Sequence, residues 1–274
     1  MTLTRNAWLI LGLVSLAACS EDDGVIVAPK VPLAYTRFIH AVPDTSAMDW
    51  RFIDILENSP AAFGLTYRNF TPYQATAVGT HQLRIFTTST NIDITSVPLI
   101  DESVTLQANT YYTIVHVGYA RTGQSPADKL LVLTDNIPDV AAGSVAVRAV
   151  NLGTGLGNLD IFASASGGSA PLPASPLFTN VGYLSATAYS NLTPGPLTLR
   201  ATAAGQTTVM ADSLAPAGLA ADASANLTAV GGSTRGGSAF SAFAFPRSVA
   251  GSGAPQGAVF QKPGITYIID RNPR

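Results

Sequence analysis

One stretch of sequence decides the fold: Arg37-Phe-Ile-His-Ala-Val-Pro-Asp-Thr-Ser-Ala-Met-Asp-Trp-Arg-Phe52. It predicts an apolar strand, a polar turn at Pro43 and Asp44, and a second strand that starts at Asp49. A stretch of like pattern starts at Arg148 and contains Asp160. Arg148 lies 111 positions after Arg37, and Asp160 lies 111 positions after Asp49. The matched offset indicates an internal repeat.

The composition favours an exported all-β protein. The 274 residues allow one large domain or two of ordinary size. Charged residues make up 12 % and apolar residues 47 %, so the chain can bury a sizeable core beneath a surface of Ser, Thr, Asn and Gly. Without the first 18 residues the chain has 14 basic and 17 acidic side chains. Since no basic stripe is present, we do not expect nucleic acid as a partner.

The N-terminus predicts a lipoprotein signal peptide at residues 1–18. Arg5 precedes an apolar run at residues 7–16, which is too short to span a bilayer and typical of a signal peptide. Leu16-Ala-Ala-Cys19 then resembles the bacterial lipobox, in which the cysteine receives the acyl chains. We therefore expect Cys19 to anchor the protein in a membrane, with residues 19–33 as the lipidated N-terminus and linker.

The residues after Cys19 bear on location. Ser20-Glu-Asp-Asp23 resembles the acidic tethers that accompany export to the cell surface in some diderm bacteria. A merely solvated spacer is the alternative interpretation. We expect a protein of the cell envelope that is lipid-anchored in the outer membrane, with surface exposure left open.

A first domain is predicted at residues 34–140. Short strand signals recur along it, at residues 35–40, 49–53, 73–78, 81–87, 91–99, 103–106, 111–119 and 129–134. Residues 59–67 are ambiguous between a helical turn and an irregular edge. Gly79 and Thr80 predict a hairpin between the strands at 73–78 and 81–87. Strands at this spacing are typical of an antiparallel sandwich.

A second domain is predicted at residues 141–274. Its strand signals lie at residues 145–151, 158–163, 182–189, 196–203, 225–230, 239–245 and 265–270. Phe243 and Phe245 are expected to share one face. Asp135 and Asp270 each follow an apolar strand and precede a proline by three residues, which we interpret as strand-ending Asx-type turns. The predicted fold is all-β, with two tandem immunoglobulin-like antiparallel β-sandwich domains after the signal peptide and linker.

The opening of the first domain resembles the domain-of-unknown-function family numbered 4397. That family begins with Arg, two hydrophobic residues, His-Ala-Ser-Pro-Asp and a following Asp-hydrophobic strand, and Val42 stands here where the family often has Ser. The second copy departs further, because Asn151 replaces the His40 type and residues 153–157 replace the Pro-Asp turn. The resemblance implies secreted or lipid-anchored bacterial proteins with immunoglobulin-like sandwiches, and no assigned activity.

Few residues carry a chemical signal. His40, Asp44 and Asp49 are the candidate binding residues, with a structural role in fixing the turn as the alternative. The remaining histidines and carboxylates have no metal-ligand spacing, so neither a metal nor a cofactor is expected. No Gly-x-Ser-x-Gly motif occurs, and the glycines at 153–157 lead into a strand rather than a helix N-terminus. No catalytic residue is predicted.

Two functional hypotheses remain open from the sequence. The first is a non-enzymatic binding, adhesion or scaffold module, with an envelope protein or glycan as ligand and sandwich-end loops as contacts. The second is an envelope hydrolase whose acidic residues meet in an inter-domain cleft. An acidic pair in an aromatic-lined cleft would favour the hydrolase.

Overall fold

The structure is a computed structural model that describes residues 31–57, 59–165 and 170–274. Residues from Pro32 to Arg274 form one compact unit. Within the described ranges, the strands lie in four sheets of four strands each. The predicted signal peptide, Cys19 and most of the linker lie outside the described residues.

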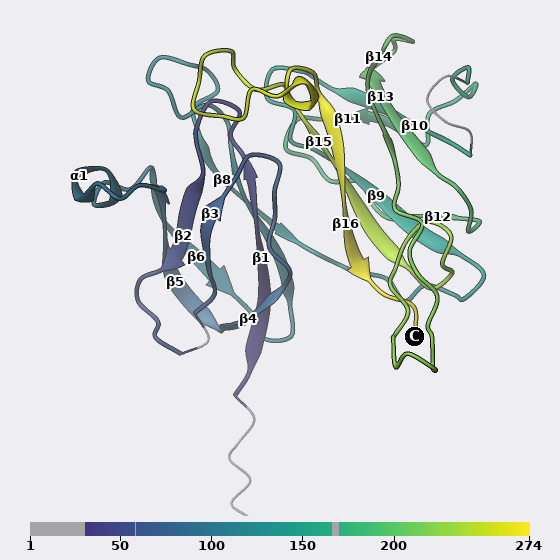
Figure 1. The fold of residues 1–274 in the computed structure, drawn as a ribbon, viewed down its shortest axis with the longest axis horizontal. Helices are drawn as coiled ribbons and strands as arrows, with labels where there is room; N and C mark the ends of the chain where they lie inside the picture. Colours follow the sequence, from purple (N-terminus) through teal and green to yellow (C-terminus); the bar gives the residue numbers. More distant parts are fainter. Residues whose placement is uncertain (1–30, 58, 166–169) are drawn as a thin grey trace, which may run out of the picture. The chain divides into compact units, whose positions relative to one another are not determined.

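The first sandwich contains strands β1 to β8, which Figure 1 draws in purple to teal. One of its sheets has the order β4-β1-β7-β8 and the other has the order β3-β2-β5-β6. The strands are β1 (Leu33–Ala41), β2 (Met48–Phe52), β3 (Ala61–Leu65), β4 (Gln74–Ala77), β5 (Gly79–Thr87), β6 (Ile100–Leu106), β7 (Tyr111–Val117) and β8 (Lys129–Thr134). The short helix α1 (Ile92–Thr95) lies between β5 and β6.

The second sandwich repeats this plan eight strands later. Its sheets have the orders β12-β9-β15-β16 and β11-β10-β13-β14. The strands are β9 (Val145–Asn151), β10 (Leu159–Ser164), β11 (Phe178–Val181), β12 (Ser190–Leu192), β13 (Thr198–Ala203), β14 (Val209–Leu214), β15 (Ala239–Phe245) and β16 (Gly264–Arg271). Pairing is antiparallel except between β1 and β7 and between β9 and β15. The prediction of two tandem β-sandwiches is confirmed, and the two sandwiches have the same strand order as each other.

Side-chain alternation builds each core. In β2, Met48, Trp50 and Phe52 are buried while the residues between them are partly exposed, which is the period of two that a sheet face requires. The second sandwich has its own apolar core, which includes Val147 and Phe240. Each sandwich therefore buries a separate core between its two sheets.

A third apolar cluster joins the two sandwiches. Strand β1 is buried on both faces: Phe38 packs in the first core, and Ile39 packs in the joining cluster. From the second sandwich, Phe243 and Phe245 of β15 enter the same cluster, as their shared face predicted. Burial on both faces explains why these strands are nearly continuous runs of apolar residues.

The predicted hairpin at Gly79 is wrong. Strands β4 and β5 belong to different sheets of the first sandwich, so the chain crosses from one layer to the other at this point. Gly79 has a φ of +127°, which L-residues rarely adopt. The glycine signal correctly marked a sharp change of direction, but not which strands pair.

Three predicted strands are absent from the described structure at their predicted positions. Residues 91–99 contain α1, residues 182–189 connect β11 to β12, and residues 225–230 form only isolated bridges. Strand β14 was missed, because its buried side chain is the small Ala211 and the polar Asp212 and Ser213 follow it. Ile92 is 73 % exposed, so its apolar character reflected no burial.

Candidate functional site

His40 is a buried residue that holds the turn after β1. Its Nδ1 accepts a hydrogen bond from the Val42 backbone N–H at 3.2 Å, so Nε2 carries the proton. Nε2 lies 3.0 Å from the Ser46 carbonyl oxygen and donates to it. Burial lowers the pKa of His40 to about 3, and the positive potential of His116 acts in the same direction. The neutral imidazole thus satisfies backbone groups on both sides of the turn.

Asn151 holds the corresponding turn of the second sandwich in the same way. Its Oδ1 accepts from the Gly153 backbone N–H at 2.9 Å, and its Nδ2 donates to the Gly157 carbonyl at 2.9 Å. Both partners lie at the same sequence offsets as the partners of His40. Since an amide and a neutral imidazole each offer one acceptor and one N–H donor in this arrangement, the substitution preserves the turn.

The two candidate carboxylates, Asp44 and Asp49, accept hydrogen bonds from different segments of the first sandwich. Asp44 is buried, and its oxygens accept the backbone N–H groups of Ala120 and Arg121, both at 3.1 Å. Asp49 accepts from the backbone N–H of Gly64 at 2.8 Å, and from a threonine hydroxyl at 2.6 Å. The structure therefore gives His40, Asp44 and Asp49 separate hydrogen-bond partners.

Two ion pairs cross between the sandwiches in a reciprocal way. Arg37 of β1 pairs with Asp270 of β16, with 2.8 Å between Nη1 and Oδ1. Arg148 of β9 pairs with Asp135, the residue that follows β8. The four side chains are at most 4 % exposed. We call these four residues the inter-repeat clamp.

Each carboxylate of the clamp is held by its own sandwich as well. Asp135 accepts hydrogen bonds from the hydroxyls of Thr113, at 2.5 Å, and Tyr73, at 2.7 Å. The Arg37 guanidinium donates through Nε to Thr113 at 2.7 Å and lies 4.5 Å from the centre of the Tyr73 ring. Burial raises the pKa of Tyr73 well above its usual range, so its phenol stays a donor.

In the second sandwich, Asp270 and Arg148 of the clamp have the corresponding contacts. Asp270 accepts from Ser241 at 2.6 Å and from Tyr189 at 2.8 Å. Arg148 donates to Ser241 at 2.7 Å and lies 5.0 Å from the centre of the Tyr189 ring. Burial lowers the pKa of Arg148, but the charges of Asp135, Tyr189 and Asp270 together outweigh burial, and the net direction is upward.

The clamp corrects the interpretation of Asp135 and Asp270 as strand-ending Asx-type turns. Both carboxylates are instead buried acceptors in ion pairs between the sandwiches. Buried pairs whose remaining lone pairs are hydrogen-bonded resist separation, because removing one partner leaves an uncompensated charge. Together with the joining apolar cluster, the clamp fixes one sandwich against the other.

A long loop of the second sandwich is held by hydrogen bonds from the first sandwich. This β15–β16 loop, residues 246–263, receives three hydrogen bonds from the guanidinium of Arg68. The acceptors are the carbonyls of Pro246 at 2.6 Å, Val259 at 3.0 Å and Lys262 at 2.6 Å. A Cβ at Gly264 would stand 2.6 Å from Arg68 Nη1, so glycine at that position leaves room for the guanidinium.

The turn marked out in the sequence also contacts this loop. The Pro43 carbonyl accepts from the Val249 backbone N–H at 2.8 Å. Arg121, whose backbone N–H is held by Asp44, donates through Nη2 to the Gly251 carbonyl at 3.2 Å. Asp44 thus helps to position the loop.

A groove of about 780 Å³ lies against the β15–β16 loop. Tyr119 of the first sandwich lines it together with three segments of the second. Those segments supply Thr154, Gly155, Leu156, Met210, Pro246, Arg247, Ser248, Val249, Ala250, Gln261 and Pro263. Its volume is in the range of small-molecule and peptide sites. The sequence missed it, because its residues come from loops with no motif of their own.

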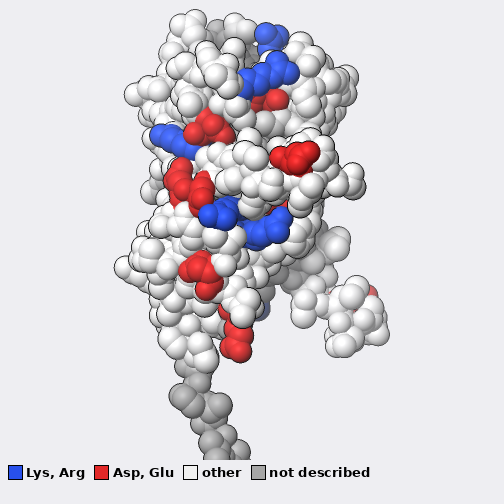
Figure 2. Space-filling view, turned by 90° about the vertical axis from the view of Figure 1, so that its left-hand side faces the viewer, with Lys and Arg blue, Asp and Glu red and all other residues white. Residues whose placement is uncertain are grey.

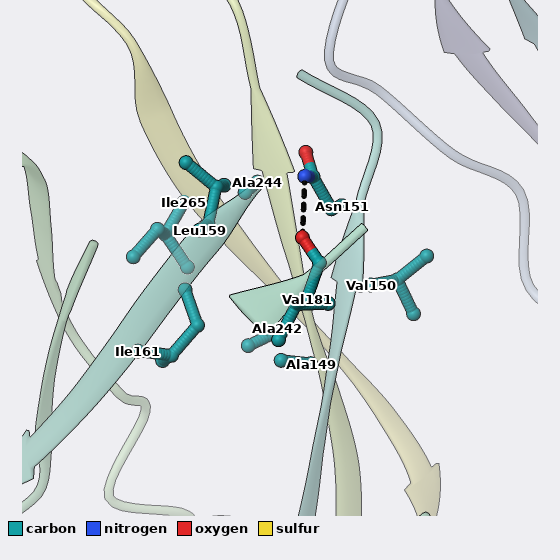
Figure 3. A pocket seen from close by; sticks show the side chains of 9 residues that line it. All are labelled: Ala149, Val150, Asn151, Leu159, Ile161, Val181, Ala242, Ala244 and Ile265. Carbon is teal, nitrogen blue, oxygen red and sulfur yellow. Dashed lines mark hydrogen bonds between the residues drawn. The ribbon is translucent and has the colours of Figure 1, made fainter. Parts of the chain in front are cut away.

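A second cavity is too small for a ligand. It lies inside the second sandwich, has a volume of about 10 Å³, and is lined by apolar side chains and Asn151. Figure 3 shows the Asn151 amide bonded to the Val181 carbonyl at its edge. Room for about one water at most makes this a packing gap rather than a site.

Charge and metal chemistry are sparse in the described part of the chain. On the face drawn in Figure 2, acidic and basic side chains are interspersed on a largely uncharged surface. Among the described residues, no group of three or more His, Cys, Asp or Glu side chains is placed to hold a metal ion. No helix of the described ranges is long and apolar enough to cross a membrane.

The fold and the interface define a protein of two β-sandwiches joined face to face by a buried ionic clamp. Residues 34–162 match the model of a domain-of-unknown-function family, DUF4397. The match supports the family resemblance of the opening stretch, and it runs through the first sandwich to the end of the second copy of that stretch. No curated protein matches the chain.

Proposed function

We propose that this chain is a lipid-anchored, non-enzymatic binding module of a diderm bacterial cell envelope. The lipobox-like residues 16–19 support the anchor at Cys19, and the outer membrane is the proposed location. The acidic stretch after Cys19 favours display at the cell surface. We further propose that the second sandwich is a diverged copy of the same family domain, since it has the same strand order and the same turn chemistry at Asn151.

One observation carries the binding role: the groove beside the β15–β16 loop is preorganised. Arg68 and Pro43 of the first sandwich hold the loop that forms one wall. A site whose walls are already fixed loses little conformational freedom when a ligand binds. An envelope protein or a glycan is the proposed class of partner.

The groove favours binding over hydrolysis. Its lining residues, all of them described, include no Asp or Glu. The acidic pair between the sandwiches, Asp135 and Asp270, is occupied by arginines and buried. Carboxylate-based glycoside hydrolysis needs two carboxyl groups that flank the substrate. The hydrolase alternative therefore has no support at this groove.

Protease shaving of intact cells tests the anchored, surface-facing arrangement. We expect protease to remove the wild-type protein from the cell surface while periplasmic markers survive. A Cys19→Ala variant, which has no thiol to acylate, should lose its membrane association. Protection of the wild type until the outer membrane is broken would contradict the surface location. Unchanged membrane association of Cys19→Ala would contradict the lipid anchor.

A further inference from the structure

We infer that the groove takes a peptide segment with aliphatic side chains and a carboxylate, which is bound by Arg247 and Ser248. This inference rests on the proposed binding function and adds the ligand class. Arg247 is exposed and is the one charged residue among those that line the groove, all of which are described. It has no carboxylate partner within the described ranges.

Ser248 is the second observation that points to a ligand. It lines the groove, it is 1 % exposed, and its Oγ has no hydrogen-bond partner among the described residues. A buried hydroxyl without a partner costs free energy, which an acceptor from outside would recover. Arg247 precedes Ser248 in the sequence and lines the same groove, and a guanidinium and a hydroxyl can each donate to a carboxylate.

The rest of the lining selects peptide over saccharide. Arg247 and Ser248 are donors, and no lining carboxylate is present to accept from sugar hydroxyls. The apolar part of the groove is mainly aliphatic, with Leu156 and Met210 among its residues. Aliphatic walls match aliphatic peptide side chains, and the groove volume exceeds that of one side chain.

Tyr119 adds the contribution of the first sandwich. It lines the groove, and its hydroxyl lies close to Gly155, where a Cβ would stand 3.4 Å from it. Gly155 has a φ of +80°, which favours glycine. Because both sandwiches contribute walls, the binding surface depends on the fixed arrangement set by the inter-repeat clamp.

Calorimetric titration of the full chain in detergent tests the inference. The probes are an N-acetylated Leu-Ala-Val-Leu peptide with a free carboxylate, its C-terminal amide, and tetragalacturonate. We expect the peptide with the free carboxylate to bind about tenfold or more tightly than its amide, because it gains one charge-assisted hydrogen bond. Arg247→Gln should remove that preference, and Ser248→Ala should reduce it. The matched control Arg84→Gln, which changes a partly exposed arginine of β5 outside the groove, should keep it.

The outcomes separate this inference from the proposed function. Equal binding of carboxylate and amide, or binding of neither, would overturn the inference. Binding of tetragalacturonate that Arg247→Gln abolishes, without peptide binding, would also overturn it and would keep a binding function. Loss of surface display in the shaving experiment concerns the proposed function alone.

Discussion

At the residue scale, one hydrogen-bonding task is solved by two different side chains. His40 and Asn151 each bridge a backbone N–H two residues on and a carbonyl six residues on. The sequence showed the 111-residue offset but presented the change from His to Asn as a departure from the pattern. The geometry shows that the change conserves the donor and the acceptor, so His40 has a structural use that requires no ligand.

Stability should depend on pH through His40. Burial holds its pKa at about 3 in the folded chain, against 6.5 normally. Below pH 6.5 the unfolded chain binds the proton that the folded chain excludes, so stability is complete above that pH and falls as pH decreases toward 3. We expect His40 to account for a loss of about 2 kcal/mol between pH 7 and pH 5.

The check compares urea denaturation of wild type and His40→Asn at both pH values. The variant should show a smaller loss, because Asn does not titrate, while both chains share every other titrating group. His40→Ala should be less stable than His40→Asn at pH 7, since it leaves the turn's backbone groups unpaired at about 1–3 kcal/mol each. Parallel pH profiles for wild type and His40→Asn would contradict this role.

At the element scale, strands with alternating or continuous apolar residues were predicted well, whereas the loops that connect them were not. Strand β15 (Ala239–Phe245) was predicted with its observed bounds. The β15–β16 loop has no motif in the sequence, although it forms a wall of the groove. Its position depends on Arg68, which is nearly 180 residues away from Pro246 in sequence. A contact of that range leaves no local signal.

Arg68→Ala should loosen the β15–β16 loop. The change removes three hydrogen bonds from a charged donor to loop carbonyls, so the loop should open more often. We expect trypsin to cut after the exposed Arg247 about tenfold faster or more. Limited proteolysis with mass spectrometry measures this rate. Arg84→Ala, which removes an exposed arginine outside the loop, is the control, and an equal rate in both variants would refute the grip of Arg68.

At the scale of the whole molecule, the two sandwiches are joined by an interface of the isologous kind. In such an interface each partner offers the same set of groups, and here Arg37 meets Asp270 as Arg148 meets Asp135. The joining apolar cluster adds buried side chains from both sandwiches to this interface. The facing sheets of the two repeats, β4-β1-β7-β8 and β12-β9-β15-β16, therefore support each other.

Breaking the clamp should weaken both sandwiches. Asp270→Asn removes the shorter ion pair of the buried Arg37 guanidinium and leaves it only Asp135, at 3.9 Å, which we expect to cost about 3–5 kcal/mol. Hydrogen exchange measured in moderate urea should accelerate in β1 and in β15 alike. Arg37→Met combined with Asp270→Leu should cost less than the sum of the single changes, because no unpaired charge remains.

The control for the clamp is Asp101→Asn, which breaks the exposed pair with Arg84. We expect it to change the free energy of unfolding far less than Asp270→Asn does, since solvent screens such pairs. Faster exchange confined to the second sandwich in Asp270→Asn would show that the clamp does not couple the two repeats.

The sequence by itself determined the all-β class, the two-sandwich plan and most strands. These follow from local periodicity and turn residues, which act over a few neighbouring positions. It also contained all four clamp residues, as Arg37 and Arg148 at one offset and two strand-ending aspartates.

Only the tertiary structure decided how those residues pair and where the groove lies. Spacing does not show that Arg37 of β1 lies 2.8 Å from Asp270 and 3.9 Å from Asp135, because these distances depend on which sheets pack face to face. Likewise, Tyr119, Arg247 and Ser248 come together because Arg68 and the clamp hold loops of two repeats in place. Contacts between elements far apart in the chain depend on how side chains pack, and a pattern of neighbouring residues in the sequence does not specify that packing.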